Sequence, residues 1–263
     1  MANTIQSSES KEKKFRGLSI NRMIPNMLTL LALSAGLTAI RFALDGKWEF
    51  TVLAIVIAGI LDALDGRIAR LLKGSSKFGA ELDSLSDFVC FGVAPGLILY
   101  LWTMQEAGKF GWVLVMLFSI CCGLRLARFN VMLEDPDAPV WKNRFFTGVP
   151  APMGGALVLL PMVFSFQLGD DFFRQPWVSA VFLSVMAGMM VSIIPTYSFK
   201  NLKISRQWVL PTMLITGCIT VSIINAPWIS LSLIGCAYIL TIPFSYRAHQ
   251  KLAKTLSQEM INE

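Results

Sequence analysis

Eight apolar runs separated by short polar segments constrain the fold of this chain more than any other feature. They cover residues 25–44, 48–69, 79–102, 109–131, 152–168, 177–196, 207–225 and 228–246. Each is close to the ~20 residues that a helix needs to cross a bilayer. With 54% hydrophobic and 15% charged residues, the chain is too apolar for an ordinary soluble domain. The sequence predicts an all-α fold, a polytopic membrane helix bundle of about eight transmembrane helices, with a kink at Pro95 in the third.

The positively charged residues lie mostly on one side of this predicted membrane domain. If the N-terminus is cytosolic, 19 of the 23 Lys and Arg residues fall in inner segments, and the others are Arg41, Lys47, Lys109 and Arg174. Lysine and arginine accumulate in cytoplasmic loops, so both termini are predicted to be cytosolic. We divide the chain into a cytosolic polar tail with a short interfacial segment at 1–23, a transmembrane domain at 24–246 and a cytosolic C-terminal tail at 247–263.

Four aspartates lie where the second apolar run meets the third, at the predicted cytosolic level. On helices, Asp62 and Asp65 are spaced i,i+3, and Asp83 and Asp87 are spaced i,i+4, so each pair shares one helix face. Residues 71–78 turn the chain back, which allows the two acidic faces to meet. Facing carboxylates need a counter-charge, and hard divalent cations such as Mg²⁺ or Mn²⁺ supply it. Two such ions about 3.5–4 Å apart form the usual clamp for phosphoryl-type transfer.

Two other interpretations of the acidic cluster stay open. One is a pair of membrane helices with structural ion pairs. The other is a metal-ion transporter, although a transporter should carry acids near mid-membrane in several spans. The single histidine, His249, lies in the polar tail, so a histidine-ligated metal site is not available.

The acidic segment reads D-x2-D-G-x2-A-R-x8-G-x3-D-x3-D, with eight fixed positions over 26 residues. It resembles the signature of the CDP-alcohol phosphatidyltransferase family, integral membrane enzymes of phospholipid synthesis. The resemblance implies that Asp62, Asp65 and Asp83 are metal ligands. It also implies that Asp87 is the catalytic base, and we count Asp87 among the ligands of the two divalent ions.

Further residues at the same level are candidates for binding CDP-diacylglycerol. Asn26 and Thr29 open the first run with i,i+3 spacing, where the family often places an asparagine and a threonine near the nucleotide. A helix start with a satisfied polar pair is the alternative for them. Gly79 would allow close approach of the third helix to the second. By resemblance, the predicted set is Asn26, Thr29, Asp62, Gly66, Ala69, Arg70 and Gly79.

Arg125 and Arg128 share one face at the cytosolic end of the fourth run. Guanidinium groups hold phosphate or carboxylate in bidentate fashion, whereas snorkelling to the interface is the alternative. This pair, the eight spans and the Gly-Val-Pro-Ala-Pro element at 148–152 resemble the bacterial integral-membrane branch of the family that makes phosphatidylserine.

The resemblance to that branch implies a reaction and a setting. The enzyme would transfer the phosphatidyl group of CDP-diacylglycerol to the hydroxyl of L-serine and release CMP. Choline, glycerol phosphate and inositol phosphate remain alternative acceptors, but choline has no anionic group for the arginines. We expect a homodimer in the bacterial inner membrane, with the active site on the cytosolic side and no nucleic-acid partner.

Overall fold

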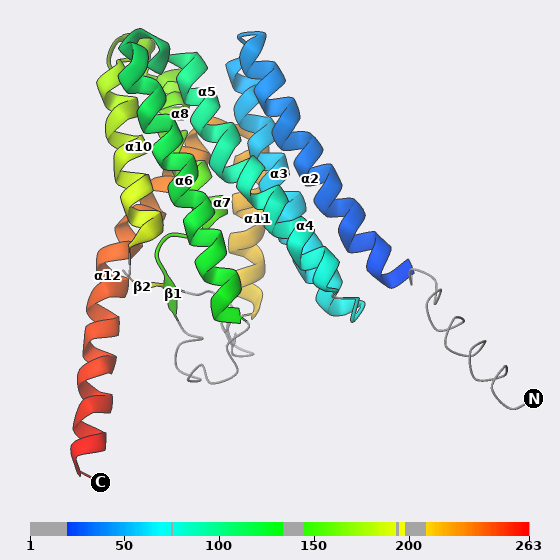
Figure 1. Cartoon of the computed structure of the whole chain (residues 1–263), viewed down its shortest axis with the longest axis vertical. Helices are drawn as coiled ribbons and strands as arrows, with labels where there is room; N and C mark the ends of the chain where they lie inside the picture. The colour runs from blue at the N-terminus through cyan, green and yellow to red at the C-terminus, as the bar shows by residue number, and fades with distance from the viewer. Residues whose placement is uncertain (1–19, 75, 134–144, 193–194, 198–208, 263) are drawn as a thin grey trace, which may run out of the picture.

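The computed structural model of this protein describes residues 20–74, 76–133, 145–192, 195–197 and 209–262, and it is a bundle of helices (Figure 1). The first half contains α2 (Ile20–Leu44), α3 (Trp48–Leu71), α4 (Lys77–Asp87), the π-helix η2 (Phe88–Val93), α5 (Ala94–Trp102), the 3-10 helix η3 (Met104–Ala107) and α6 (Gly108–Leu133). The second half contains α7 (Ala151–Val158), α8 (Leu160–Leu168), α9 (Asp170–Phe173), α10 (Pro176–Val191), α11 (Val209–Asn225) and α12 (Pro227–Asn262). One short antiparallel pair, β1 (Phe145–Thr147) with β2 (Pro195–Tyr197), links the segment before α7 to the segment after α10.

Each of the eight apolar runs forms helix, which confirms the predicted all-α membrane bundle. Among the described residues, five helical segments are long and apolar enough to cross a membrane, and they are Met23–Leu44, Lys77–Trp102, Met104–Met132, Ala151–Leu168 and Pro227–Ser245. Two further apolar helices, Pro176–Val191 and Leu210–Asn225, are shorter. The protein is therefore built as an integral membrane protein, and the count of eight spans stays a prediction.

Three helix ends differ from the predicted runs, and the first is the start of α2, which begins at Ile20 rather than at residue 25. The run predicted at 177–196 ends early, because α10 stops at Val191 and residues 195–197 pair with β1 instead. Pro195 explains this difference, since proline offers no N–H to continue a helix. At the other end of the chain, α12 continues past the run at 228–246 to Asn262. Its 36 residues span about 54 Å, which exceeds a bilayer core of about 30 Å.

The kink predicted at Pro95 takes the form of a π-helical turn. The third run is continuous through α4, η2 and α5, and within η2 the Ala94 N–H donates to the carbonyl of Val89, five residues back. Pro95 cannot donate to the carbonyl of Phe91, which favours this wider turn. A Cβ added at Gly155 of α7 would lie 2.9 Å from that carbonyl oxygen, so α7 packs directly on the π-helix.

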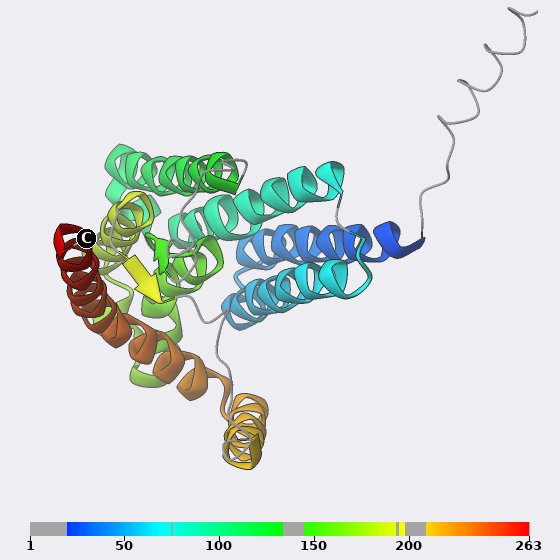
Figure 2. The same cartoon turned by 90° about the horizontal axis from the view of Figure 1, so that it is seen from below.

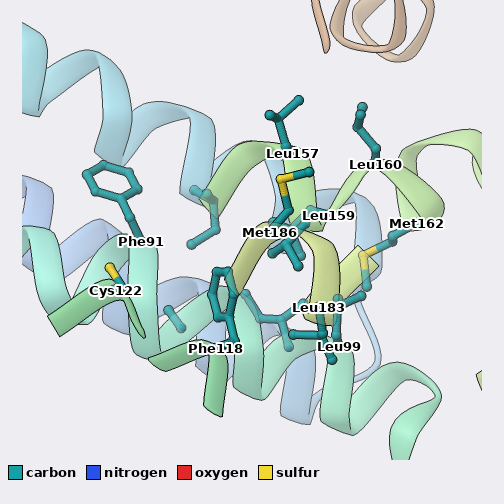
Figure 3. Packing of buried hydrophobic residues seen from close by; sticks show 14 of the residues in the cluster. Phe91, Leu99, Phe118, Cys122, Leu157, Leu159, Leu160, Met162, Leu183 and Met186 are labelled. Carbon is teal, nitrogen blue, oxygen red and sulfur yellow. The ribbon is translucent and has the colours of Figure 1, made fainter. Parts of the chain in front are cut away.

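The hydrophobic core lies between α5, α6, α7, α8 and α10. Figure 3 shows Phe91 of η2, Leu99 of α5, Phe118 of α6, Leu157 of α7 and Leu183 of α10 among the side chains of this core, and all five are buried. Close packing extends to α2, where a Cβ at Gly36 would lie 2.6 Å from Cys90 Sγ. This core holds η2, which continues α4, against the rest of the bundle.

The ends of the helices have a common arrangement. In Figure 1, the start of α2, the α3–α4 turn and the end of α12 lie at the same end of the molecule, and the α2–α3 turn lies at the opposite end. In Figure 2, α11 stands to one side of α2–α6 and adjoins α12. Most of its large side chains are exposed, among them Leu210, Met213 and Ile224. The acidic helices thus turn at the end of the bundle where the described chain begins and ends.

Candidate active site

The acidic hairpin forms where α3 turns into α4. The α3 helix ends with the Gly74 N–H donating to the Ala69 carbonyl, after Lys73 takes a positive φ of 48°. Ser76 then caps α4, because its hydroxyl accepts from the Gly79 N–H at 3.0 Å. The turn therefore falls within the predicted segment 71–78.

Three of the four predicted aspartates meet across this hairpin. Carboxylate oxygens of Asp62 from α3 and of Asp83 and Asp87 from α4 all lie within 4.8 Å of one another. Asp83 Oδ1 and Asp87 Oδ1 are buried and have no hydrogen-bond partner among the described residues. Buried carboxylates without partners are costly, and an all-oxygen donor set is what hard divalent cations prefer. The cluster could therefore hold a metal ion.

Asp65 lies beside this cluster in a different environment. It is 4% exposed, and its Oδ2 accepts a hydrogen bond from Thr29 Oγ1 of α2 at 2.6 Å. Its carboxylate still interacts electrostatically with those of Asp62 and Asp83. The tertiary structure thus ties the fourth acid to the first helix.

The small residues of the motif contact different neighbours. No atom of the described structure outside the helix lies within 4 Å of a Cβ added at Gly66, so the space there is open, and Ala69 is partly exposed. Arg70 is exposed, and its Nε donates to the Gly66 carbonyl at 2.9 Å. At Gly79 the expectation was wrong: an added Cβ would lie 2.8 Å from Asn26 Oδ1, so this glycine admits α2 rather than α3. The reason is that the start of α4 crosses α2 at this level.

The two arginines of α6 have separate surroundings despite their i,i+3 spacing. Arg125 is 8% exposed, interacts electrostatically with Asp87, and its Nε is buried with no hydrogen-bond partner in the described chain. Arg128 instead donates through its two terminal nitrogens to the carbonyls of Val191 at 3.0 Å and Ser192 at 3.1 Å. Arg125 therefore lies beside the acidic cluster, while Arg128 binds the C-terminal end of α10.

An apolar cavity beside α3 was not foreseen from the sequence. It has a volume of about 420 Å³ and lies between α3, α7, α8 and α12. Gly59, Ala63 and Arg67 line it from α3, and Pro152, Leu160 and Ile234 line it from the other helices. The i,i+4 pair of Gly59 and Ala63 was a usable signal, because small residues at this spacing often lie where another membrane helix comes close.

A second contact that sequence reasoning missed joins α6 to α4. Asn130 Nδ2 donates to Ser84 Oγ at 2.9 Å, and Ser84 follows Asp83 in the chain. A polar residue ending an apolar run was the only signal for Asn130. The contact positions the end of α6 beside the acidic face of α4.

Two profiles of known protein families match this chain. The profile described as CDP-alcohol phosphatidyltransferase matches residues 22–194, and that described as CDP-alcohol phosphatidyltransferase 2 matches residues 207–243. The chain belongs to the CDP-alcohol phosphatidyltransferase family. The family is one of transferases, and its match includes the acidic hairpin, both arginines and the β1 segment.

Three relatives of this CDP-alcohol phosphatidyltransferase share one name. It is 34% identical over 244 residues to the CDP-diacylglycerol–serine O-phosphatidyltransferase of Mycobacterium tuberculosis (strain H37Rv), covering 93% of this chain and 85% of the relative. It is 36% identical over 184 residues to the enzyme of that name from Helicobacter pylori (strain 26695), covering 69% and 74%. The enzyme of that name from Bacillus subtilis is 34% identical over 179 residues, covering 68% and 92%.

Proposed function

We propose that this protein transfers the phosphatidyl group of CDP-diacylglycerol to the hydroxyl of L-serine and releases CMP. The observation that carries the proposal is the cluster of the half-buried residues Asp62, Asp83 and Asp87 at one end of a membrane bundle, in which Asp83 Oδ1 and Asp87 Oδ1 are buried without a hydrogen-bond partner among the described residues. The names of the relatives support the choice of donor and acceptor.

Mg²⁺ or Mn²⁺ suits the cluster, because every donor is a carboxylate oxygen, and Asp83 and Asp87 each have one buried oxygen without a hydrogen-bond partner among the described residues. Asp62, Asp83 and Asp87 would hold the cation, with Asp65 next to them, and the two-ion clamp is part of the proposal. Bound divalent cations would neutralise the pyrophosphate and the charge that develops during transfer.

Asp87 serves as the general base in this mechanism. The serine hydroxyl oxygen forms a bond to the phosphorus that carries diacylglycerol, and the bond from that phosphorus to the bridging oxygen breaks. CMP leaves with the bridging oxygen, and the hydroxyl proton passes to the Asp87 carboxylate. The position of Asp87 at the end of α4, with a buried Oδ1 that has no hydrogen-bond partner among the described residues, supports this role.

The donor lipid is proposed to lie across α3. An acyl chain would occupy the apolar cavity beside Gly59 and Ala63. The open space over Gly66 would admit the pyrophosphate and cytidine toward the acidic face, lined by Ala69 and Arg70. Asn26 of α2 and Gly79 of α4 contact each other and remain proposed nucleotide contacts.

Arg125 is the proposed partner of the serine carboxylate. It is a buried cation whose Nε lacks a hydrogen-bond partner within the described residues, and it interacts with the proposed base Asp87. A guanidinium group binds a carboxylate with good geometry, whereas choline would bring a second cation to it. This environment favours serine over choline as the acceptor.

The setting is part of the proposal. We place the enzyme in the bacterial inner membrane as a homodimer, with the transmembrane domain at 24–246, both termini in the cytosol and the acidic hairpin on the cytosolic side. The common end of α2, the α3–α4 turn and α12 supports a single face for the termini and the site (Figure 1).

The test is a product assay with purified enzyme and CDP-diacylglycerol. Labelled L-serine, glycerol phosphate, inositol phosphate and choline are supplied in turn, and the lipid products are separated by thin-layer chromatography. Phosphatidylserine should form with Mg²⁺ or Mn²⁺ and not in EDTA. Asp83→Asn should abolish the product, while Asp45→Asn, an exposed aspartate paired with Lys47 at the other end of α2, should not. A product with another alcohol, or full turnover in chelator, would contradict the proposal.

A further inference from the structure

We propose that Thr29 is a positioning residue for Asp65, and that α2 thereby holds the two acidic helices in register. The inference rests on the proposed function in one respect, namely that the aspartates hold divalent cations. It assigns Thr29 a role through another side chain, in place of the nucleotide contact expected from the sequence.

The link between Thr29 and Asp65 is short and shielded from solvent. Thr29 Oγ1 lies 2.6 Å from Asp65 Oδ2, and both residues are 4% exposed. The hydroxyl also lies 3.1 Å from the Pro25 carbonyl, but it has a single proton. The shorter bond to a charged acceptor is the stronger one, so the proton is directed to the carboxylate.

The same stretch of α2 also contacts α4. Ser86, which lies between Asp83 and Asp87, donates to the Thr29 carbonyl at 3.4 Å. Gly79 at the start of α4 packs against Asn26 of α2. One face of α2 therefore touches the helix that carries Asp65 and the helix that carries the other acids.

This arrangement gives Thr29 a definite effect on the site. A carboxylate has two oxygens, and the bond from Thr29 holds one of them, which fixes the plane of the group and leaves the other oxygen for a cation. Partners that orient a metal ligand typically contribute 10–100-fold to metal affinity or activity. A nucleotide contact would instead need the hydroxyl to be free and the side chain to be accessible.

The experiment measures Mn²⁺ affinity of the purified full chain without substrates, beside kinetics. Thr29→Val keeps the shape and loses the hydroxyl, and it should weaken Mn²⁺ binding by about 10-fold or more. Thr29→Ser keeps the hydroxyl and should bind Mn²⁺ like the parent. Thr38→Val is the matched control, because Thr38 is exposed on the same helix and bonds only its own helix carbonyl at Ser34; it should leave affinity unchanged.

A double-mutant cycle decides whether Thr29 acts through Asp65. In an Asp65→Ala background, Thr29→Val should cause no further loss of Mn²⁺ affinity, and an additive loss would overturn the proposal. Melting temperatures in EDTA separate loss of fold from loss of metal. If the Thr29→Val protein does not fold, Thr29→Ala takes its place. Weaker Mn²⁺ binding in Thr29→Ala, with parental Mn²⁺ binding in Thr29→Ser, then supports the positioning role.

The failures can be told apart. Parental Mn²⁺ affinity in Thr29→Val, with or without a raised KM for CDP-diacylglycerol, overturns the positioning role and leaves the metal site standing. Parental Mn²⁺ affinity in Asp65→Ala and Asp83→Asn overturns the proposed metal site, and the role of Thr29 falls with it.

Discussion

Asp87 is the last residue of α4, and its carboxylate interacts with two other acids and with a buried arginine. This position combines two possible duties, metal ligation and proton transfer. If proton transfer is its main duty, Asp87→Asn should keep Mn²⁺ and CDP-diacylglycerol binding while turnover falls by about 10²–10⁴-fold. Mn²⁺-dependent lipid binding measured beside turnover checks this.

The other three aspartates provide the comparison for Asp87. Asp62→Asn and Asp83→Asn each remove the charge of a proposed ligand, and Asp65→Asn removes the charge next to them, so metal affinity and nucleotide binding should weaken together with rate in all three. If Asp87→Asn loses metal as badly as these variants, its role is ligation and another group is the base. Normal turnover in Asp87→Asn would refute the mechanism at its central step.

Arg125 and Arg128 should respond differently to the same substitution. Lysine keeps the charge and loses the planar fork. Arg125→Lys should raise the KM for serine, because the group beside Asp87 loses its bidentate geometry. Arg128→Lys should instead destabilise the protein by about 1–3 kcal/mol, because one ammonium group replaces the paired bonds to the end of α10. Serine kinetics and thermal melting of both variants test the assignment, and an altered serine KM in Arg128→Lys alone would reverse it.

At the scale of the elements, the π-helix depends on a close contact with α7. Gly155→Ala would place a Cβ 2.9 Å from the backbone of Phe91, where no flexible side chain can give way. We expect a loss of about 1–3 kcal/mol in stability, as overpacked sites typically show. Thermal melting of the purified protein in detergent is the measurement.

Gly188 provides the matched control for Gly155. It lies within α10, and a Cβ added there meets no atom of the described chain within 4 Å. Gly188→Ala should therefore leave the melting temperature unchanged or raise it, since alanine is the better helix former. Equal melting temperatures for the two variants would mean that α7 does not pack closely against the π-helix.

At the scale of the whole molecule, the two ends of the bundle are predicted to face opposite sides of the membrane. Lys73 lies in the α3–α4 turn and Lys47 in the α2–α3 turn, at opposite ends of the molecule (Figure 1). Cysteines introduced at Lys73 and at Lys142, which lies outside the described residues, should react with an impermeant maleimide only from the cytosol. One at Lys47 should react only from outside. The background is a variant whose less buried cysteines, Cys121, Cys218 and Cys236, are replaced by alanine. Labelling at Lys73 from outside would overturn the predicted topology.

Periodicity along the chain was enough to predict the helices and the faces they share. The i,i+3 pair Asp62 and Asp65 and the i,i+4 pair Asp83 and Asp87 follow from the turn of a helix, and the turn at 71–78 brings Asp62 to both acids of α4. The family was also predictable from local sequence, because its signature lies within one hairpin of 26 residues.

Packing between distant segments decided the rest. Asp65 accepts a hydrogen bond from Thr29, 36 residues away in the chain, and Gly79 packs against α2 rather than α3. Arg125 and Arg128 share one helix face but have different partners, because the end of α10 lies beside Arg128. The cavity beside α3 likewise needs α7, α8 and α12 to exist. The hydrogen bonds of a helix are local, so its own sequence determines which residues share a face. The neighbour that each face meets depends on how all the helices pack together, and only the tertiary structure decided that.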